Sequence, residues 1–491
     1  MKKNNLIRLT AMLLALLSAL SLCACTKSNL TVSSDDPASG AQSPSGLPTP
    51  GDPTPSAPSS GNGNVTPSGD PISPLPSDDP VEPTPSEDPV EPTPSKDPTP
   101  TPTPSDDPVD PPEPEKTVEV PANTVRHVFT HCLINDPAKG CATASGPLDV
   151  DCLTVSEFEK LLQSLYDNDF VLININDMYA LHKNGTARLL PTVTVPAGKK
   201  PLVISIDDVT YDPKKRGSGM IDRLVIENDT IMGCYDNADG STTLTDGEVF
   251  PILEKFLKTH PDFSYNGAKF TLALTGFAGI LGYRTDEQYA EQGIDVAKER
   301  EKAMVVVNWL KENGYNFACH SYSHSNYTTC SLERVQRDVM MWNRNVKPLI
   351  GDTKVFVYPY GAWTEYGTAK HDLLREEGYV MFCGTSQLNT IWDGKQPKKG
   401  GIASGTGTIY LERFTMTGFT VRTYGSTATY LNYYFNYFKD QGYSDDEAQA
   451  KAQKHYDVNY PTARKNMLEY CVPEQIYDHE NRYHKILPDE E

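Results

Sequence analysis

The sequence predicts an α/β fold built on a mostly parallel sheet or barrel. Beyond Thr117, short apolar runs rich in β-branched residues alternate with stretches of helical periodicity. The runs are almost continuously apolar, as expected of strands that are buried on both faces. Two of the helical stretches end at a glycine, which is a common helix terminator. The predicted strands span residues 201–208, 268–275, 316–319, 354–357, 379–383 and 408–411, and the predicted helices span residues 251–258, 295–313, 331–346 and 367–377.

The first 25 residues have the pattern of a secretory signal. A cationic start is followed by an apolar run over residues 11–22 that is too short to span a bilayer comfortably. The run closes on Leu22-Cys23-Ala24-Cys25, which resembles the bacterial lipobox. An ordinary cleaved signal with an incidental cysteine is the alternative. We therefore expect residues 1–25 to be a lipoprotein signal peptide ending at a lipidated Cys25, and the chain to be anchored on the extracellular face of a bacterial cell membrane.

The composition of residues 26–116 predicts a disordered stalk. Most of the 40 prolines of the chain lie before Thr117, and Asp-Pro-Val-Glu-Pro-Thr-Pro-Ser begins at Asp79 and again at Asp88. Such a segment has too few large apolar side chains to fold and tends to be extended. The whole chain carries 65 acidic and 44 basic side chains, for a formal net charge of -21. Because no cluster of Lys and Arg appears, we expect no nucleic-acid partner.

Three local patterns organise the remaining sequence. Ser156-x-x-Glu159 predicts a capping box, and the apolar residues that follow at helical spacing predict a helix. Residues 224–248 predict a hairpin insertion with Asp239-Gly240 as its turn. From Ser426 onward, aromatic residues at helical spacing predict a packing face on a C-terminal helical extension. The apolar residues of the first helix are Phe158, Leu161, Leu162 and Leu165, and the aromatic residues of the extension are Tyr430, Tyr433, Tyr434, Tyr437 and Phe438.

Polar residues of catalytic type follow three of the predicted strands. Asp207-Asp208 ends the first strand, His320 and His324 follow the third, and Tyr-Pro-Tyr-Gly over residues 358–361 follows the fourth. Functional groups gather at the carboxyl ends of parallel strands. Two imidazoles and one carboxylate can bind Zn²⁺ or a similar ion and leave positions open for water and substrate. His320 and His324 would project to one side if their segment began a helix, with Asp208 completing the set.

The neighbouring carboxylates of Asp207 and Asp208 suit two different roles. One can bind the metal while the other accepts a proton from water. Adjacent residues of an extended strand point to opposite faces, so one of the two must lie where the strand breaks into a loop.

Together, these motifs resemble the polysaccharide deacetylase superfamily, also called NodB-homology or carbohydrate esterase family 4, over roughly residues 125–420. The resemblance implies a distorted (β/α) barrel over residues 117–420, followed by the extension over residues 421–491. It also implies the following site: Asp207 as general base, Asp208, His320 and His324 as ligands of a divalent metal, with Zn²⁺ expected, and the Tyr360 backbone N–H as an oxyanion donor. We further expect Tyr358, Pro359 and Trp363 to bind substrate.

Three departures from the family pattern are present. One, a long spacing from Asp208 to His320, is partly explained by the predicted hairpin insertion, and the other two leave parts of the site open. The family often has an Arg before the Pro of its third motif, where it orients the base, and this chain has Tyr358. The family usually supplies a His acid in a Leu-x-His pattern, and the corresponding segment here reads Leu411-Glu412-Arg413. The general acid is therefore unassigned. His371, on a predicted helix, is expected to be a surface residue.

The function implied is metal-dependent hydrolysis of N-acetyl groups on an extracellular glycan such as peptidoglycan. An O-acetyl esterase acting on xylan through the same site is the near alternative. A catalytically inactive glycan-binding lipoprotein is an alternative of another class, motivated by the two departures, and a solute-binding lipoprotein is disfavoured because it has no need for the metal residues. The expected partners are an acetylated polysaccharide and the membrane, and no protein partner is predicted.

Overall fold

The computed structural model describes residues 116–141 and 147–489. The predicted signal peptide with Cys25, and the stalk up to residue 115, lie outside these residues. Within the described part of the chain, no helix combines the length and the apolar character needed to cross a membrane.

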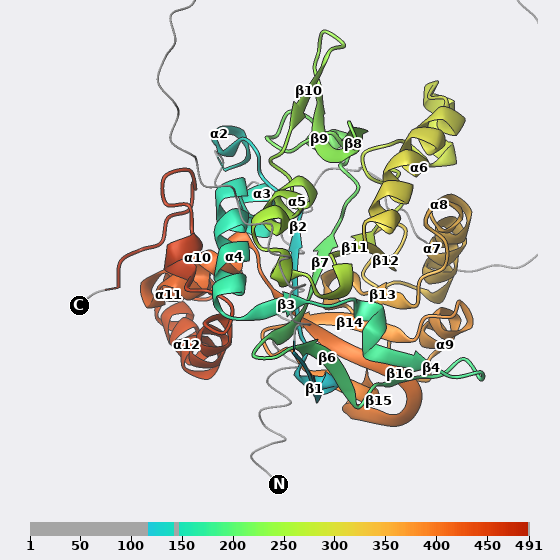
Figure 1. Cartoon of the computed structure of the whole chain (residues 1–491). Helices are drawn as coiled ribbons and strands as arrows, with labels where there is room; N and C mark the ends of the chain where they lie inside the picture. Colours follow the sequence, from blue (N-terminus) through green and yellow to red (C-terminus); the bar gives the residue numbers. More distant parts are fainter. Residues whose placement is uncertain (1–115, 142–146, 490–491) are drawn as a thin grey trace, which may run out of the picture. The chain divides into compact units, whose positions relative to one another are not determined.

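Seven parallel strands close into a barrel (Figure 1). In spatial order they are β11 (Thr271–Leu274), β12 (Asn316–Cys319), β13 (Val355–Val357), β14 (Met381–Ser386), β16 (Gly401–Thr415), β2 (Arg126–His131) and β7 (Lys200–Asp207), and β7 pairs again with β11. Strand β3 (Phe170–Leu172) pairs in parallel with the start of β7, and β15 (Ile391–Lys398) pairs antiparallel with β16. The predicted (β/α) barrel is confirmed. All six predicted strands are present, whereas β2 was not predicted.

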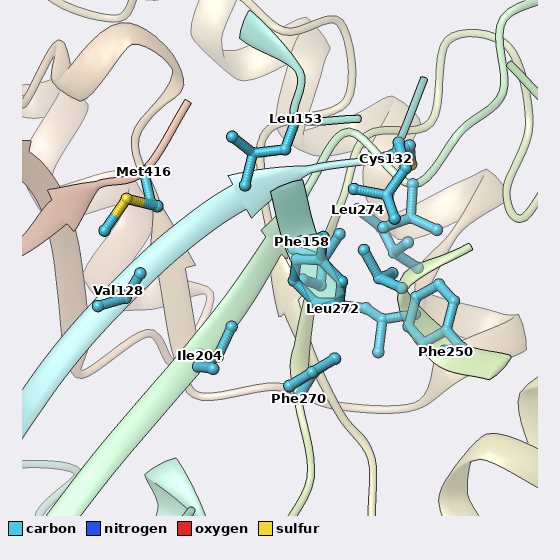
Figure 2. Close-up of a cluster of buried hydrophobic side chains, with 14 of the residues drawn as sticks. Val128, Cys132, Leu153, Phe158, Ile204, Phe250, Phe270, Leu272, Leu274 and Met416 are labelled. Carbon is cyan, nitrogen blue, oxygen red and sulfur yellow. The ribbon is translucent and has the colours of Figure 1, made fainter. Parts of the chain in front are cut away.

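Helices surround the barrel and cover its outer face. The longer ones are α4 (Val155–Asp167), α5 (Val249–Thr259), α6 (Val296–Glu312), α7 (Leu332–Asn345) and α9 (Ala369–Glu376), and the short ones are α2 (Pro137–Gly140), α3 (Pro147–Asp151) and α8 (Lys347–Ile350). Outward-facing strand residues pack against them, as Figure 2 shows for Val128 of β2, Ile204 of β7 and Leu272 of β11 near Phe158 and Phe250 of the helices. The four helix positions predicted within segment 251–377 are confirmed.

The predicted capping box of α4 was placed two residues too late. Thr154, not Ser156, caps the helix: its side chain accepts from the Glu157 backbone N–H, and the Glu157 carboxylate accepts from the Thr154 backbone N–H. Both sequence stretches satisfy the same four-residue pattern, so the pattern alone could not separate them. The predicted apolar face is correct, since Phe158, Leu161, Leu162 and Leu165 are all buried.

The two ends of the barrel differ in what covers them. At the amino ends of the strands lie two antiparallel ribbons, β1 (Thr117–Pro121) with β6 (Thr192–Pro196) and β4 (Tyr179–Leu181) with β5 (Ala187–Leu189). Beyond the carboxyl end of β7, the chain forms the meander β8 (Arg223–Glu227), β9 (Thr230–Asp236) and β10 (Thr242–Thr245), at the top of Figure 1. Asp239 and Gly240 lie in the β9–β10 turn as predicted, and the positive φ of 83° at Gly240 explains the glycine.

The C-terminal extension is helical and is attached through a buried charge network. It comprises α10 (Gly418–Gly425), α11 (Thr427–Asp440), α12 (Asp445–Met467) and α13 (Pro473–Ile476). The fully buried Arg482 donates to the carboxylates of Asp149 and Glu157, which lie on α3 and α4. The aromatic face serves packing, as predicted, because Tyr430 is buried and Tyr434 stacks on His455 of α12.

Candidate metal and catalytic site

Asp208 lies where strand β7 breaks into a loop. The strand ends at Asp207, and Asp208 has a φ of 58°, in the left-handed region that only a few per cent of non-glycine residues occupy. Its backbone N–H donates to the Ala273 carbonyl oxygen of the neighbouring strand at 3.1 Å. Positive φ values of this kind concentrate at functional sites. The break lets both carboxylates face the same end of the barrel, which resolves the conflict noted in the sequence.

His320 and His324 approach one another through a loop rather than a helix. Residues 320–326 after β12 contain no helix, and both Ser321 and His324 have positive φ values, of 58° and 50°. The conditional expectation of a helix is therefore wrong. The reversal of the backbone at these two residues, rather than helical spacing, brings the imidazoles within 5.0 Å of each other.

Each imidazole is oriented by a contact to its Nδ1 atom. His320 Nδ1 donates to the Val357 carbonyl oxygen at 2.9 Å, and His324 Nδ1 lies 3.0 Å from the Tyr360 hydroxyl. Burial lowers the pKa of His320 to about 4, which favours the neutral imidazole. Partners of this kind fix the tautomer of metal-binding histidines and leave Nε2 to face the ion.

The three predicted metal ligands meet. One ligand atom from each of Asp208, His320 and His324 lies within 4.8 Å of the others, and His324 Nε2 is 3.5 Å from Asp208 Oδ2. Two imidazole nitrogens and one carboxylate oxygen, with their orienting contacts in place, match the donor set that holds catalytic zinc. The residues of this site therefore fit a divalent cation.

Asp207 is buried beside this cluster in a paired, ionised state. Its Oδ1 and Oδ2 accept from Arg413 Nη1 and Nη2 at 2.7 and 2.9 Å, and its Oδ2 lies 3.7 Å from His320 Nε2. Burial alone would raise the pKa of Asp207, but the Arg413 guanidinium and then His320 outweigh burial and hold that pKa well below its ordinary value. The Asp207 carboxylate is therefore ionised before the reaction begins, which is the state in which it can accept a proton.

Arg413 was missed as a functional residue. The sequence lacks Arg at position 358, and Arg413 from β16 occupies the place beside the base instead. Its guanidinium stacks 4.1 Å from the centre of the Phe129 ring, and its Nη1 also donates to Ser205 Oγ at 2.9 Å. The signal was present, because an Arg at the end of a strand buried on both faces needs an acidic partner.

His131 is a second functional candidate that sequence reasoning missed. It ends β2, in register with Asp207 on the neighbouring strand, and its Nδ1 donates to the Asp151 carbonyl oxygen at 3.1 Å. Its charge also acts on both Asp207 and Asp208. The available signal was weak, because the segment Arg126–His131 contains only two apolar residues, Val128 and Phe129, and was not assigned as a strand.

The residues predicted to bind substrate do not share one environment. Tyr358 is 1% exposed and its hydroxyl bonds to Thr364, so its side chain belongs to the core and not to a substrate groove. Pro359 is buried as well, whereas Trp363 is half-buried at the rim of the same segment. The substrate contacts expected of the Tyr358 and Pro359 side chains are therefore corrected.

Tyr360 and His371 also depart from expectation in part. Tyr360 has a φ of 59° within the short helix Pro359–Gly361, and its side chain contacts His324 in addition to the backbone role predicted for it. His371 is fully buried between Tyr366 and Phe382, so it is not the surface residue expected. It lies on α9, and burial lowers its pKa to about 4.

Comparisons with known proteins bear on this site. Residues 285–381, which include His320, His324 and Tyr360, match the family described as polysaccharide deacetylase. Similar solved structures include the Streptococcus pyogenes deacetylase PplD in complex with acetate (15% identity, 62% of this chain and 94% of that chain, TM-score 0.32). The chain is similar to the same degree to IcaB from Ammonifex degensii, with 12% identity over 60% of this chain and 92% of that chain and a TM-score of 0.31. It is also similar to BC0361, a polysaccharide deacetylase from Bacillus cereus, with 11% identity over 61% of this chain and 67% of that chain and a TM-score of 0.32.

Such low identities and TM-scores carry no functional argument, and no curated protein matches the chain. The match over residues 285–381 supports a polysaccharide deacetylase domain in this chain and a hydrolase of the deacetylase class.

Proposed function

We propose that this protein removes N-acetyl groups from an extracellular glycan by metal-dependent hydrolysis. The observation that carries the proposal is the meeting of Asp208, His320 and His324 ligand atoms within 4.8 Å, with the ionised Asp207 alongside. This arrangement combines a site for a divalent cation with a proton acceptor, which together are the requirements for activating water at neutral pH.

Asp208, His320 and His324 would hold the cation, and Zn²⁺ is the expected ion for this donor set. A cation in this place supplies Lewis acidity, which polarises the acetyl carbonyl and lowers the pKa of water. The contacts from Val357 and Tyr360 to the two imidazoles keep both Nε2 atoms directed at it.

Asp207 is the proposed general base. Its two-point contact with Arg413 fixes the direction of the carboxylate and keeps it ionised, so that it can take a proton from the attacking water. The backbone N–H of Tyr360 is proposed to stabilise the oxyanion that forms when the water adds to the acetyl carbon.

His131 is the proposed general acid, which the sequence did not assign. Because its Nδ1 proton is committed to the Asp151 carbonyl oxygen, its Nε2 carries the transferable proton in the charged form. An amide nitrogen must be protonated before it can leave as an amine, and His131 stands next to Asp207 in register for that role. This acid favours a working enzyme over the catalytically inactive glycan-binding alternative.

The same acid distinguishes N-acetyl from O-acetyl substrates. An alkoxide leaves with less need of protonation than an amine, so His131→Asn should reduce acetate release from an N-acetylated glycan more strongly than from acetylxylan. Equal loss on both substrates, with faster release from acetylxylan in the unmodified enzyme, would favour the O-acetyl esterase.

Anchoring by lipid on Cys25 and a location at the extracellular face of the membrane are part of the proposal. A tethered enzyme would meet peptidoglycan at high effective concentration, which supports peptidoglycan as substrate. Expression with an alkyne-labelled fatty acid tests the anchor: the label should appear on the full chain and be absent from Cys25→Ala.

The direct test of function is acetate release from N-acetylglucosamine oligomers, peptidoglycan and acetylxylan, with and without a chelator. Chelation, His320→Ala and Asp207→Asn should each reduce release, by about 10²- to 10⁴-fold for the base variant. The exposed His182 lies in a turn outside the cluster, so His182→Ala is a matched control that should retain full release. Release that persists in chelator, or in Asp207→Asn, would contradict the proposal.

A further inference from the structure

A cavity of about 600 Å³ is lined by residues of the loops that follow the carboxyl ends of β7, β11 and β12. Its walls include Asp212 and Lys214, which follow Asp208 in the chain, and Tyr322 and Ser323, which lead directly into His324. The two loops that carry the metal ligands therefore also border this cavity. Its volume lies within the range of sites for small ligands or for a sugar residue.

Three cations line this cavity: Lys214, Arg334 and Arg337. All three are exposed, and within the described part of the chain none of them forms an ion pair. Arg334 is held close to the metal cluster, because its Nη2 donates to Ser323 Oγ at 3.2 Å. Unpaired cations on one wall are notable in a chain with a formal net charge of -21.

A second cavity, of about 520 Å³, shows the contrasting arrangement. Its Arg216 pairs with Asp222 and Asp236 at 2.9 and 3.0 Å, and its Arg223 also pairs with Asp236. Lys302 likewise pairs with Glu299 at 2.9 Å, and Arg284 donates to the backbone carbonyl oxygens of Tyr211 and Gly282, so the cations of that cavity already have partners within the protein.

The acidic residues of the first cavity are engaged by the protein. Asp338 is 2% exposed and accepts from the backbone N–H groups of Tyr322 and Ser323 at 2.6 and 2.9 Å and from the Tyr327 hydroxyl at 2.7 Å. Asp286 is fully buried and accepts from the Gln288 N–H at 2.8 Å. These carboxylates are directed into the fold, so their charge does not satisfy the guanidinium groups at the surface.

Asp212 is the one acid that is partly exposed, and its Oδ1 accepts from the Lys214 backbone N–H at 2.9 Å. Half-buried rings of Phe277 and Tyr289 complete the lining. Flat aromatic faces beside charged groups suit a sugar ring that bears an ionised substituent.

We infer that this cavity binds an anionic substituent, a phosphate or a carboxylate, on a sugar next to the one that loses its acetyl group. Arg334 and Arg337 supply the planar donors that recognise either oxyanion, and Lys214 adds a third positive charge. The inference rests on the proposed function and deepens it, because it defines the substrate as an anionic glycan and not a neutral one.

The test compares three soluble substrates of equal length: a neutral N-acetylglucosamine oligomer, the same oligomer with a phosphate ester, and the same oligomer with a lactyl carboxylate. The unmodified enzyme should favour the anionic oligomers in kcat/KM by about 10-fold, mainly through KM, since charge-assisted hydrogen bonds exceed neutral ones. Whichever oligomer is preferred identifies phosphate or carboxylate as the ligand. The preference should shrink as salt is added.

Arg337→Gln should lower the ratio of anionic to neutral kcat/KM by about 5- to 10-fold, and Lys214→Gln by less. Lys160→Gln is the matched control, because Lys160 is exposed on α4 and does not line the cavity, and it should leave the ratio unchanged. Equal kcat/KM for neutral and anionic oligomers, or an unaltered ratio in Arg337→Gln, would overturn the inference.

Failure of the proposed function would look different, because acetate would be released from none of the three oligomers. The cavity is then tested by calorimetric titration with N-acetylglucosamine 6-phosphate against N-acetylglucosamine. Tighter binding of the phosphate, lost in Arg337→Gln, supports the anionic site, and equal binding of the two sugars contradicts it.

Discussion

The same strands place apolar side chains at one end of the barrel interior and charged side chains at the other. Ala318 and Leu411 face inward within an apolar layer, and two positions further along each strand stand His320 and Arg413. Strand β7 likewise passes from Val203 in the apolar layer to Asp207 in the site. Because strand side chains alternate with a period of two, these residues lie on one face at successive levels.

The difference shows how a fold can hold buried charge. At the carboxyl ends of the strands, Asp207 and Arg413 are both at most 2% exposed and satisfy one another at 2.7 and 2.9 Å. At the amino ends, the interior is filled by aliphatic side chains such as Val203 and Ile409. The apolar layer contributes net stability, and the charged layer above it contributes chemistry, with each buried charge tolerated only while its partner is present. The following changes test that division.

Breaking the charged pair should have the largest effect on stability. Arg413→Met leaves the buried Asp207 carboxylate without its partner, which should cost about 3–5 kcal/mol in the free energy of unfolding. The double variant Asp207→Asn with Arg413→Met removes both charges and should regain part of that loss. Urea unfolding of the two single variants and the double variant measures the coupling. Strictly additive losses would show that the pair is not a unit.

Breaking the apolar layer should reduce stability and spare the chemistry. Ile409 is fully buried on β16, four residues before Arg413 on the same face. Ile409→Ala should lower the free energy of unfolding by about 2–5 kcal/mol. The kcat for acetate release per folded molecule should stay within about 2-fold of the unmodified enzyme at low temperature. A loss of kcat comparable to that of Asp207→Asn would show that the apolar and charged layers do not have separate roles.

Glu248 contrasts with Asp207, because its buried carboxylate has no cationic partner. It caps α5 and accepts from the backbone N–H groups of Leu133 and Val249, and burial raises its pKa to about 8. The folded state therefore keeps a proton that the unfolded chain releases near pH 4.5. Stability should fall as pH rises from about 4.5 to 8, by up to roughly 1.4 kcal/mol per unit. In Glu248→Gln this part of the slope should disappear, as followed by chemical unfolding between pH 5 and 9. An unchanged slope would show that Glu248 ionises normally.

The smallest effect is expected at a contact that only orients a proposed ligand. Tyr360→Phe removes the hydroxyl that lies 3.0 Å from His324 Nδ1 and leaves the aromatic ring in place. Zn²⁺ affinity should fall by about 10- to 100-fold, as is typical for such orienting partners. Competition against a fluorescent chelator measures it, with Tyr366→Phe as control, because the Tyr366 ring packs against His371 and not against His324. An unchanged Zn²⁺ affinity in Tyr360→Phe would show that the loop backbone alone orients His324.

Local sequence patterns were sufficient to predict much of the fold and most of the site residues. Asp207, Asp208, His320 and His324 stand out because each pair follows a continuous apolar run, and such runs report strands without any knowledge of their neighbours. Arg413 and His131 were missed because their meaning depends on barrel closure. Only when β2 and β16 join β7 do they face Asp207.

The errors at finer scale also have physical causes. A four-residue spacing of histidines suits a helix, but the left-handed backbone at Ser321 and His324 produces the same convergence in a loop, and sequence does not report such strain. Tyr358 was assigned to substrate together with the rest of the Tyr-Pro-Tyr-Gly segment. The positive φ of 59° at Tyr360 interrupts the extended backbone, so the Tyr358 side chain is buried in the core while the Tyr360 side chain contacts His324.

The central claim is that Asp208, His320 and His324 hold a single divalent cation. Zinc content of the purified chain, measured by mass spectrometry after loading and dialysis, tests it without reference to catalysis. We predict about one zinc per unmodified chain and per His182→Ala chain, and less than a tenth of that in His320→Ala and in Asp208→Asn. An unmodified chain that retains no zinc or other divalent metal, or a His320→Ala chain that retains as much, would contradict the account.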